Sequence, residues 1–384
     1  MHAPDRLRRA YVEEPAFLRT VRDLVEHESP TGDLEAANAL ADHLTHLLTR
    51  DGWSTERIAR DEVGDVVRAT LPGNDPSDAT LILAHYDTVW PVGTLRDPMP
   101  WRHENDVLHG PGVLDMKAGI AAAVHAARLA RSEGPLRGPV TLLITSDEEQ
   151  GSVHSRELLE EEARRHARVL VVEMSRDDGA LKVGRKGVGV LHAAFRGVSA
   201  HAGNDPHAGA SALRELARFL LFAEGLAEPP SDDGLGTTVA VTVAHGGTVG
   251  NVIPEHAACE IDLRVLRAEE GDRVVNALHA YRPHDPRIDV HVTGGMNRPP
   301  MERTEANRTL ATEAHAHLRA MDLRLSEAVV GGGSDGNFTS ALGVATLDGL
   351  GAVGSGPHAR HEHVRVRETL QRIALLAALL RRPA

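Results

Sequence analysis

The chain has 384 residues, of which 25% are charged and 41% hydrophobic, with one Cys, 23 His and a formal net charge of −13. This length favours two domains with a sizeable core, and the single Cys excludes a disulfide framework or a zinc ribbon. The negative charge argues against nucleic acid as a partner, and without a signal peptide or an apolar run of about 18 residues we expect a cytoplasmic protein that binds no membrane.

The first half of the chain alternates helical and strand-like segments. Apolar residues follow a 3.6-residue period over much of the first 50 residues, which predicts helices there. Three β-rich runs follow at 80–84, 140–145 and 169–172, and they are almost continuously apolar, as expected for strands covered on both faces. Helical patterns separate these runs. This alternation predicts an α/β fold with a largely parallel sheet.

The pattern changes near residue 187 and returns after about residue 300. Between these points, apolar and polar residues alternate in runs such as Ala257 to Val265, which is typical of a half-exposed antiparallel sheet. We therefore predict a discontinuous α/β domain formed by residues 1–186 and 301–384, and an inserted α+β domain formed by residues 187–300.

Side chains that can bind a metal follow each of the three buried runs. His85 and Asp87 follow the first run, Glu148 and Glu149 the second, and Glu173 the third. In α/β sheets, ligands bind beyond the carboxyl ends of the strands, so we expect these groups at one edge of the sheet. Imidazole and carboxylate ligands together suit zinc or manganese. The sequence therefore predicts a metal site at this edge.

Each of these motifs also has a simpler interpretation. Asp87 can accept a hydrogen bond from a metal-bound His85 and fix its tautomer, but the pair also fits a loop histidine beside a turn-forming Asp. One of Glu148 and Glu149 can bind metal while the other acts as a general base, yet both can equally be solvated loop residues. Taken alone, the motifs leave these alternatives open.

Two further motifs supply candidates outside the three runs. Asp115 follows a glycine-rich stretch, where its carboxylate can bridge two cations or simply cap the following helix. Later in the chain, His358 follows a Gly-Pro turn, while His361 and His363 form a His-x-His pair. We favour His358 as a ligand because the turn places it after a predicted strand.

With these residues assembled, the sequence resembles the M20 family of metallopeptidases, and within it the glutamate carboxypeptidase (carboxypeptidase G2-like) branch. Eight stretches carry the resemblance, in the family's order: LILAHYDTVWPVGT (81–94), GPGVLDMKAGIAAAV (110–124), LLITSDEEQGS (142–152), VVEMSRDDGALKVGRKGVGV (171–190), AHAG (200–203), GNVIPEHAACEIDLRV (250–265), GGGSDGNF (331–338) and GSGPH (354–358). The resemblance implies a zinc-exopeptidase-like catalytic domain and an inserted ferredoxin-like domain that serves as a lid and a dimerisation surface.

The resemblance also implies two zinc ions per subunit, which Co or Mn can replace. The implied ligands are His85 and Glu173 on one ion, Glu149 and His358 on the other, and Asp115 as the bridge between them. Asp87 is then expected to orient His85, and Glu148 to act as the general base that generates a metal-bound hydroxide nucleophile. A cis peptide bond between Asp115 and Met116 is implied as well.

In the inserted domain, the resemblance implies that His201 reaches the active site of a partner subunit and stabilises the oxyanion. Arg264 and Asn251, with the backbone near Gly332, are implied to hold the substrate's carboxylate. From the residues alone, His201 can also be a surface histidine and Arg264 part of a strand salt bridge. Ala180 stands where glutamate-preferring relatives place a basic residue, which weakens an assignment to glutamate.

We therefore expect a homodimeric di-zinc hydrolase that cleaves the amide bond next to a free C-terminal carboxylate in a small peptide, with glutamate-releasing activity as one form. An N-acyl amino acid amidohydrolase of the deacetylase or desuccinylase type is the alternative. A mononuclear enzyme and a catalytically silent binding homologue are further hypotheses, although no ligand or base is missing from the sequence.

Overall fold

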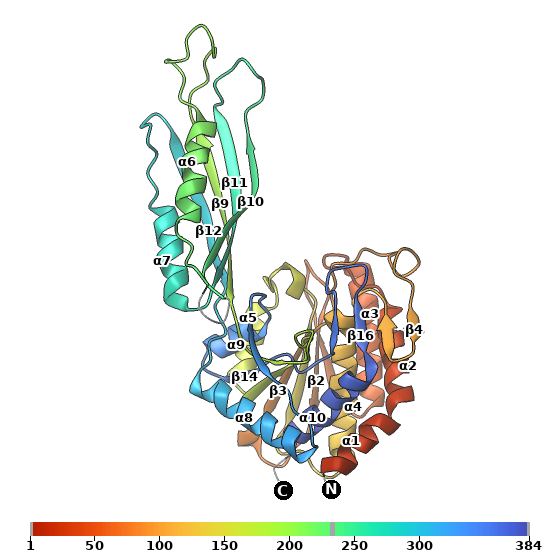
Figure 1. The fold of residues 1–384 in the computed structure, drawn as a ribbon. Coiled ribbons are helices and arrows are strands. Elements are labelled where there is room, and N and C mark those ends of the chain that lie inside the picture. The colour runs from red at the N-terminus through yellow and green to blue at the C-terminus, as the bar shows by residue number, and fades with distance from the viewer. Residues whose placement is uncertain (1–2, 231–234, 382–384) are drawn as a thin grey trace. The chain divides into compact units, whose positions relative to one another are not determined.

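The computed structural model describes residues 3–230 and 235–381, and it divides into two compact units (Figure 1). The first unit contains the described residues up to Gly184, together with Arg303–Val329 and those from Ser334 onward. The second contains the described residues of Arg185–Glu302 and Val330–Gly333. Among the described helices, none is both long enough and apolar enough to cross a membrane.

The first unit is built on a six-stranded mixed sheet. In spatial order, its strands are β1 (Ser54–Ile58), β2 (Val66–Leu71), β6 (Val140–Thr145), β3 (Thr80–His85), β7 (Arg168–Val171) and β14 (Ala345–Leu347). The last four of these are parallel to one another, while β1 and β2 add an antiparallel edge. Every residue of β3 and β6 is buried, as their continuous apolar sequences predict. This arrangement confirms the predicted α/β class with a largely parallel sheet.

Helices cover both faces of this sheet. The face of Ile82 packs with α1 (Ala3–Val12), α2 (Glu14–Val25), α3 (Leu34–Arg50), α4 (Ala118–Ser132), α8 (Glu305–Ala320) and α10 (Val366–Leu379). The face of Leu81 and Leu83 packs with α5 (Arg156–Ala163) and α9 (Gly336–Ala341). Helix α4 comes so close to the sheet that a Cβ at Gly119 would lie 2.0 Å from the carbonyl oxygen of Val172. Only glycine permits this approach, which holds the start of α4 beside the end of β7.

Short strands that the sequence patterns do not predict form two further sheets. In spatial order, the larger one contains β15 (Gly354–Ser355), β16 (His363–Arg365), β5 (Val107–His109) and β4 (Arg102–Glu104), and the smaller one pairs β13 (Glu327–Val330) with β8 (Leu181–Arg185). The four-stranded sheet brings the segment after His358 next to the segment before Asp115. Between β5 and α4, the segment Val113–Lys117 is kinked, because the backbone of Asp115 and Met116 is not helical. The peptide bond between Asp115 and Met116 is cis, as the family resemblance implies.

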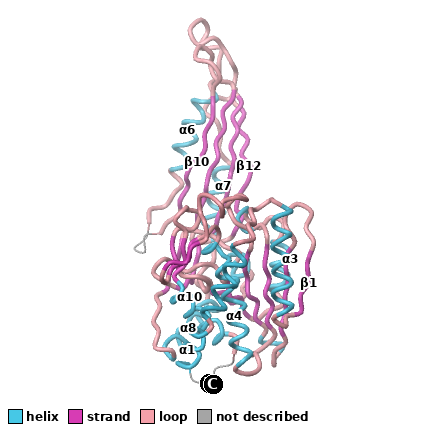
Figure 2. Tube along the Cα trace, turned by 90° about the vertical axis from the view of Figure 1, so that its right-hand side faces the viewer, coloured by secondary structure: helices cyan, strands magenta, loops and turns pink. Residues whose placement is uncertain are grey.

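The second unit consists of a four-stranded antiparallel sheet with two helices on one face (Figure 2). Its elements are the strands β10 (Thr238–Gly246), β11 (His256–Val265), β9 (Gly187–Arg196) and β12 (Asp289–Arg298), in spatial order, and the helices α6 (Ala212–Glu224) and α7 (Ala268–His279). Burial alternates along β11, and its buried residues pack with Phe219 of α6 and Leu278 of α7. This α+β unit agrees with the predicted fold class.

Candidate metal centre

Three side chains from different segments meet beyond the carboxyl end of β3. His85 is the last residue of β3, and Glu173 follows the parallel neighbour β7, so both side chains emerge at the same edge of the sheet. The Nε2 atom of His85 lies 3.3 Å from Oε1 of Glu173 and 3.1 Å from Oδ1 of Asp115. All three side chains are buried. They form the first of two groups of candidate ligands.

The second group lies on the other side of Asp115. The Nε2 atom of His358 lies 3.1 Å from Oδ2 of Asp115 and 3.1 Å from Oε2 of Glu149. Glu149 follows β6, which is parallel to β3 and adjacent to it. Asp115 therefore presents one carboxylate oxygen to each of two imidazoles. This is the arrangement expected of a carboxylate that bridges two cations.

The donor set fits divalent metal ions. Ligand atoms of His85, Asp115 and Glu149 all lie within 4.8 Å of one another, and the same holds for those of His85, Glu148 and Glu173. The Oε1 atom of Glu149 is buried and has no hydrogen-bond partner among the described residues. A buried oxygen without a partner is costly, and a cation would satisfy it. Imidazole nitrogen and carboxylate oxygen are both ligands that zinc accepts.

The carboxylates of the cluster stabilise positive charge on the groups that lie between them. Burial alone would lower the pKa of His85, but hydrogen bonds to Asp115 and the neighbouring carboxylates raise it well above its usual value. Hydrogen bonds to Asp115 and Glu149 raise the pKa of His358 to about 10. Burial opposes ionisation of Asp115, yet its bonds to these two histidines lower the pKa of its carboxyl group. The carboxylates thus create a negative potential that divalent cations can neutralise.

Asp87 is fully buried and connects the two groups of ligands. Its Oδ1 atom lies 3.3 Å from Nδ1 of His85, the ring nitrogen on the opposite side from Asp115. The backbone N–H groups of Glu148 and Glu149 donate to its two oxygens at 3.2 Å each. The hydroxyl group of Thr31 donates to Oδ2 at 2.8 Å. Asp87 therefore contacts both the imidazole ring of His85 and the loop that carries Glu148.

His201 and Asn251 belong to the second unit, where their loops are hydrogen-bonded to each other. The backbone N–H of Ala202 donates to the carbonyl oxygen of Asn251 at 2.9 Å. The exposed ring of His201 accepts hydrogen bonds at Nδ1 from the backbone N–H groups of the residues two and three positions later, at 3.1 and 3.0 Å. Because Nδ1 is an acceptor, the neutral ring carries its proton on Nε2.

Arg264 and Gly332 also lie in the second unit. The guanidinium group of Arg264 pairs with Asp262, with Nε and Nη2 donating to the two carboxylate oxygens at 2.9 and 2.8 Å. The carbonyl oxygen of Gly332 accepts a hydrogen bond from Nη1 of Arg185 at 3.2 Å. Within its own unit, Arg264 is thus part of the strand salt bridge that the sequence leaves open as its alternative role.

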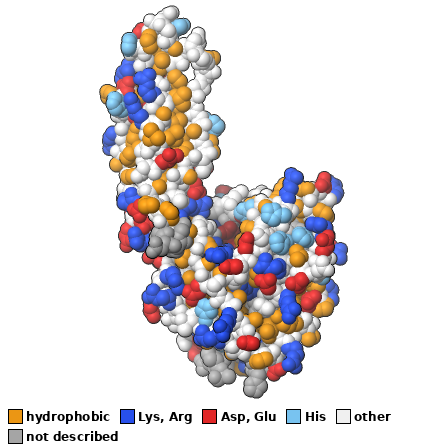
Figure 3. All heavy atoms as spheres, viewed as in Figure 1, with side chains coloured by type: hydrophobic (Ala, Val, Ile, Leu, Met, Phe, Trp, Pro, Cys, Tyr) orange, Lys and Arg blue, Asp and Glu red, His pale blue; other side chains and the backbone are white. Residues whose placement is uncertain are grey.

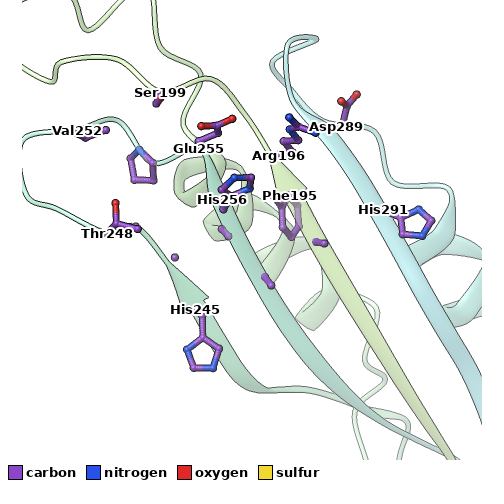
Figure 4. Close-up of a pocket in the computed structure, with 16 residues that line it drawn as sticks. Phe195, Arg196, Ser199, His245, Thr248, Val252, Glu255, His256, Asp289 and His291 are labelled. Atoms are coloured by element: carbon purple, nitrogen blue, oxygen red, sulfur yellow. The ribbon is translucent and has the colours of Figure 1, made fainter.

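A groove of about 820 Å³ lies on the second unit's sheet, on the face opposite the helices (Figure 4). Its lining includes Arg196, Glu255, His256, Asp289 and His291. None of the candidate metal ligands lines this groove. The candidate metal ligands therefore lie in the first unit and outside this groove.

Comparison with known proteins places the chain in a family. Residues 81–382 match peptidase family M20/M25/M40. The chain belongs to this family. It is 31% identical over 376 residues to carboxypeptidase G2 from Pseudomonas sp. (strain RS-16), which covers 96% of this chain and 89% of the relative. This confirms the resemblance inferred from the eight motifs, and it makes the chain an enzyme of the M20 metallo-carboxypeptidase and amidohydrolase type.

Two further comparisons extend the similarity. The chain is 28% identical over 359 residues to succinyl-diaminopimelate desuccinylase from Delftia acidovorans (strain DSM 14801 / SPH-1), covering 88% of this chain and 89% of the relative. Its fold is similar to the crystal structure of aminopeptidase PepT from Bacillus cereus, with a TM-score of 0.78, 21% identity, and coverage of 96% and 98% of the two chains. The M20 fold therefore extends over almost the whole chain.

In this M20 family member, Glu362 is a buried residue of the site that sequence reasoning missed. Its carboxylate accepts four N–H groups, one of them from the backbone of Asp115. Burial raises the pKa of Glu362 to about 7. The sequence also offers the flanking His361 and His363 as ligands, but the described ion pairs join only His358 of these three histidines to Asp115 and Glu149. An acidic residue within an apolar run would have indicated a buried carboxylate. Glu362 lies between two histidines, so the sequence around it does not indicate burial.

Proposed function

We propose that this M20 family member is a di-zinc hydrolase that cleaves the amide bond next to the free C-terminal carboxylate of a small peptide. The observation that carries this proposal is the position of Asp115, whose two oxygens face His85 and His358 at 3.1 Å each. The similarity to carboxypeptidase G2 supports the carboxypeptidase reaction. The proposal does not specify which amino acid is released, since Ala180 stands where glutamate-preferring relatives place a basic residue.

The ligand assignment follows the two groups of side chains. Each cation would have one histidine, one glutamate and the shared Asp115: His85 with Glu173 for the first, and His358 with Glu149 for the second. When bound, two such cations supply Lewis-acid polarisation of the scissile carbonyl and ease the deprotonation of a water molecule. Asp87 keeps the imidazole of His85 in the orientation that directs Nε2 to the cluster.

Glu148 is the proposed general base. Its carboxylate lies in the same cluster of ligand atoms as His85 and Glu173, and its backbone N–H is held by Asp87. It takes a proton from the attacking water while the water oxygen adds to the carbonyl carbon. It then passes that proton to the amine nitrogen as the C–N bond breaks. The products are a free carboxylic acid and a free amine.

Residues of the second unit are proposed to bind the terminal carboxylate of the substrate and to stabilise the oxyanion of the tetrahedral intermediate. The exposed His201 has an N–H at Nε2 that can donate to the oxyanion of the tetrahedral intermediate. Arg264, Asn251 and the backbone of Gly332 are proposed to bind the terminal carboxylate, which for Arg264 requires it to exchange or share its contact with Asp262. We propose that His201 serves the active site of the partner subunit.

A homodimer through the second unit is part of this proposal. Strand β10 is an edge strand, and its Val243 is 41% exposed. On α6, which packs next to β10, Leu213, Leu221 and Phe222 are exposed. Hydrophobic side chains are also visible over the second unit in Figure 3. An edge strand beside an exposed apolar helix face is a surface that a second copy could cover.

The alternative reaction is hydrolysis of an N-acyl amino acid, as the similarity to a succinyl-diaminopimelate desuccinylase suggests. Both reactions cleave an amide bond and use the same ligands and base. They differ in the group on the acyl side of that bond. A panel of C-terminally free dipeptides and N-acetyl and N-succinyl amino acids separates them by the ratio of kcat/KM.

The proposal is tested with Glu148→Gln, which removes the base while keeping its volume. We expect hydrolysis of the best substrate in the panel to fall roughly 100- to 10,000-fold, because a positioned general base contributes about that much. Metal content should stay at the wild-type level. Glu161→Gln, on the exposed face of α5, is the matched control and should leave kcat unchanged. Undiminished hydrolysis by Glu148→Gln would contradict the mechanism.

A further inference from the structure

The carboxylate of Glu362 accepts four hydrogen bonds in the interior of the first unit. Its Oε1 atom accepts the backbone N–H groups of Leu114 and Asp115 at 2.8 and 3.2 Å. Its Oε2 atom accepts the backbone N–H of Gly112 at 3.1 Å and the indole N–H of Trp90 at 2.9 Å. The residue is fully buried, so solvent cannot replace any of these bonds.

Among the side chains of this size, only a carboxylate satisfies these four donors. Each oxygen of an ionised carboxylate has two lone pairs, which matches two donors on Oε1 and two on Oε2. Glutamine has the same shape but a single acceptor oxygen, and its NH₂ group would face two N–H donors. One of the two pairs of donors, either Leu114 with Asp115 or Gly112 with Trp90, would then be buried without an acceptor, which is costly.

Glu362 and the candidate ligand His358 lie on the same short turn. The backbone N–H of Ala359 donates to the carbonyl oxygen of Gly356 at 3.0 Å, and that of Glu362 donates to the carbonyl oxygen of Ala359 at 2.8 Å. His358 contacts the carboxylate of Asp115, whereas Glu362 contacts its backbone N–H. One turn therefore contacts Asp115 at two points, at its carboxylate through His358 and at its backbone N–H through Glu362.

We propose that Glu362 is a positioning residue that places Asp115 against His358 and so sets the affinity for the second cation, the one that His358 binds. This inference rests on the proposed function. The ligands of the first cation other than Asp115 are His85 on β3 and Glu173 after β7, and neither contacts Glu362 by a described hydrogen bond or ion pair. Loss of the Glu362 carboxylate therefore weakens binding of the second cation more than binding of the first.

The test is a calorimetric titration of the metal-free chain with Zn²⁺, followed as two binding steps. His358→Ala identifies the step that belongs to the second cation, because it removes one of its ligands. In Glu362→Gln, we expect this same step to weaken roughly 10- to 100-fold, as for other residues that orient metal ligands. The other step should change much less. Glu133→Gln is the matched control, because it alters a buried carboxylate that pairs with Arg6 elsewhere in the first unit.

Four outcomes overturn the inference. Wild-type affinities in Glu362→Gln, or equal weakening of both steps, would show that Glu362 does not position Asp115 for the second cation. A wild-type chain with a single binding step contradicts the proposed function and this inference together. If circular dichroism shows that Glu362→Gln does not fold, Trp90→Phe takes its place, because it removes one of the four donors and keeps the carboxylate. The second step should then weaken by a smaller factor, and an unchanged affinity overturns the inference.

Discussion

The carboxylate of Asp87 contacts both a candidate metal ligand and the loop that carries the proposed base. It is fully buried, faces Nδ1 of His85, and accepts the backbone N–H groups of Glu148 and Glu149. An asparagine at this position could not accept all of these hydrogen bonds, because one oxygen would be replaced by a donor. The orientation of His85, a proposed metal ligand, and that of the proposed base Glu148 are therefore coupled through Asp87.

We predict that Asp87→Asn lowers zinc affinity roughly 10- to 100-fold, the usual range for a partner of a metal-bound imidazole. It should also lower kcat at saturating zinc, since the loop that carries Glu148 loses its acceptor. Thr31→Val removes the hydroxyl group that donates to Asp87 at 2.8 Å, leaves the Asp87 carboxylate in place, and should have a smaller effect on both quantities. Zinc titration and steady-state kinetics measure them. Wild-type affinity in Asp87→Asn would show that His85 does not need the Asp87 carboxylate, and that the backbone carbonyl oxygen of residue 87, 3.0 Å from Nδ1, is partner enough.

At the residue scale, the sequence predicts those ligands that follow long buried strands. His85, Glu149 and Glu173 are recognisable because each comes directly after a continuous apolar run, and parallel strands bring their carboxyl ends together. Glu362 is not recognisable in this way. Three of its four partners are backbone N–H groups about 250 residues earlier in the chain, and backbone groups leave no residue-type pattern in the sequence.

At the scale of elements, α2 and α4 pack together through a buried histidine. The Nε2 atom of His125 on α4 lies 3.0 Å from the hydroxyl oxygen of Thr20 on α2, and the ring of Phe17 packs edge-on against the imidazole. Burial, assisted by Arg128 and Arg19, lowers the pKa of His125 to about 4. The folded chain therefore keeps this ring neutral at pH values where an unfolded chain protonates it.

This packing predicts a pH dependence of stability. Between pH 6.5 and about 4, the unfolded state binds a proton at His125 that the folded state does not, so the free energy of unfolding falls as the pH decreases. The loss over this window is on the order of 3 kcal/mol. Urea unfolding of metal-free His125→Gln should show a weaker pH dependence than the wild type. His103→Gln, at an exposed position, should keep the wild-type dependence. Parallel curves for His125→Gln and wild type would contradict the prediction.

The short elements mark the limit of sequence-based prediction of the fold. The long strands and most helices of both units follow from their periodic patterns, because each presents enough residues to show a period of 2 or 3.6. Strands β4, β5, β15 and β16 have two or three residues each and show no period. Yet the sheet they form brings the turn with His358 to Asp115, so the sequence patterns select His358 as a candidate ligand but do not place it next to Asp115.

At the scale of the whole molecule, the proposed dimer gives a direct prediction. Leu221 on α6 is 74% exposed, and a charge there should oppose burial against a second copy. We expect Leu221→Glu to shift the chain from dimer to monomer in size-exclusion chromatography with light scattering. Val12→Glu alters a similarly exposed residue of α1, at 72%, and should leave the dimer intact. A wild-type chain that is already monomeric would contradict the proposed assembly.

The central claim is that two cations share the carboxylate of Asp115. Anomalous diffraction from zinc-loaded crystals, measured on both sides of the zinc absorption edge, tests it most directly. We predict two peaks per chain, one beside His85 and Glu173 and the other beside Glu149 and His358, with Asp115 between them. A single peak, or two peaks of which neither lies next to Asp115, would contradict the claim.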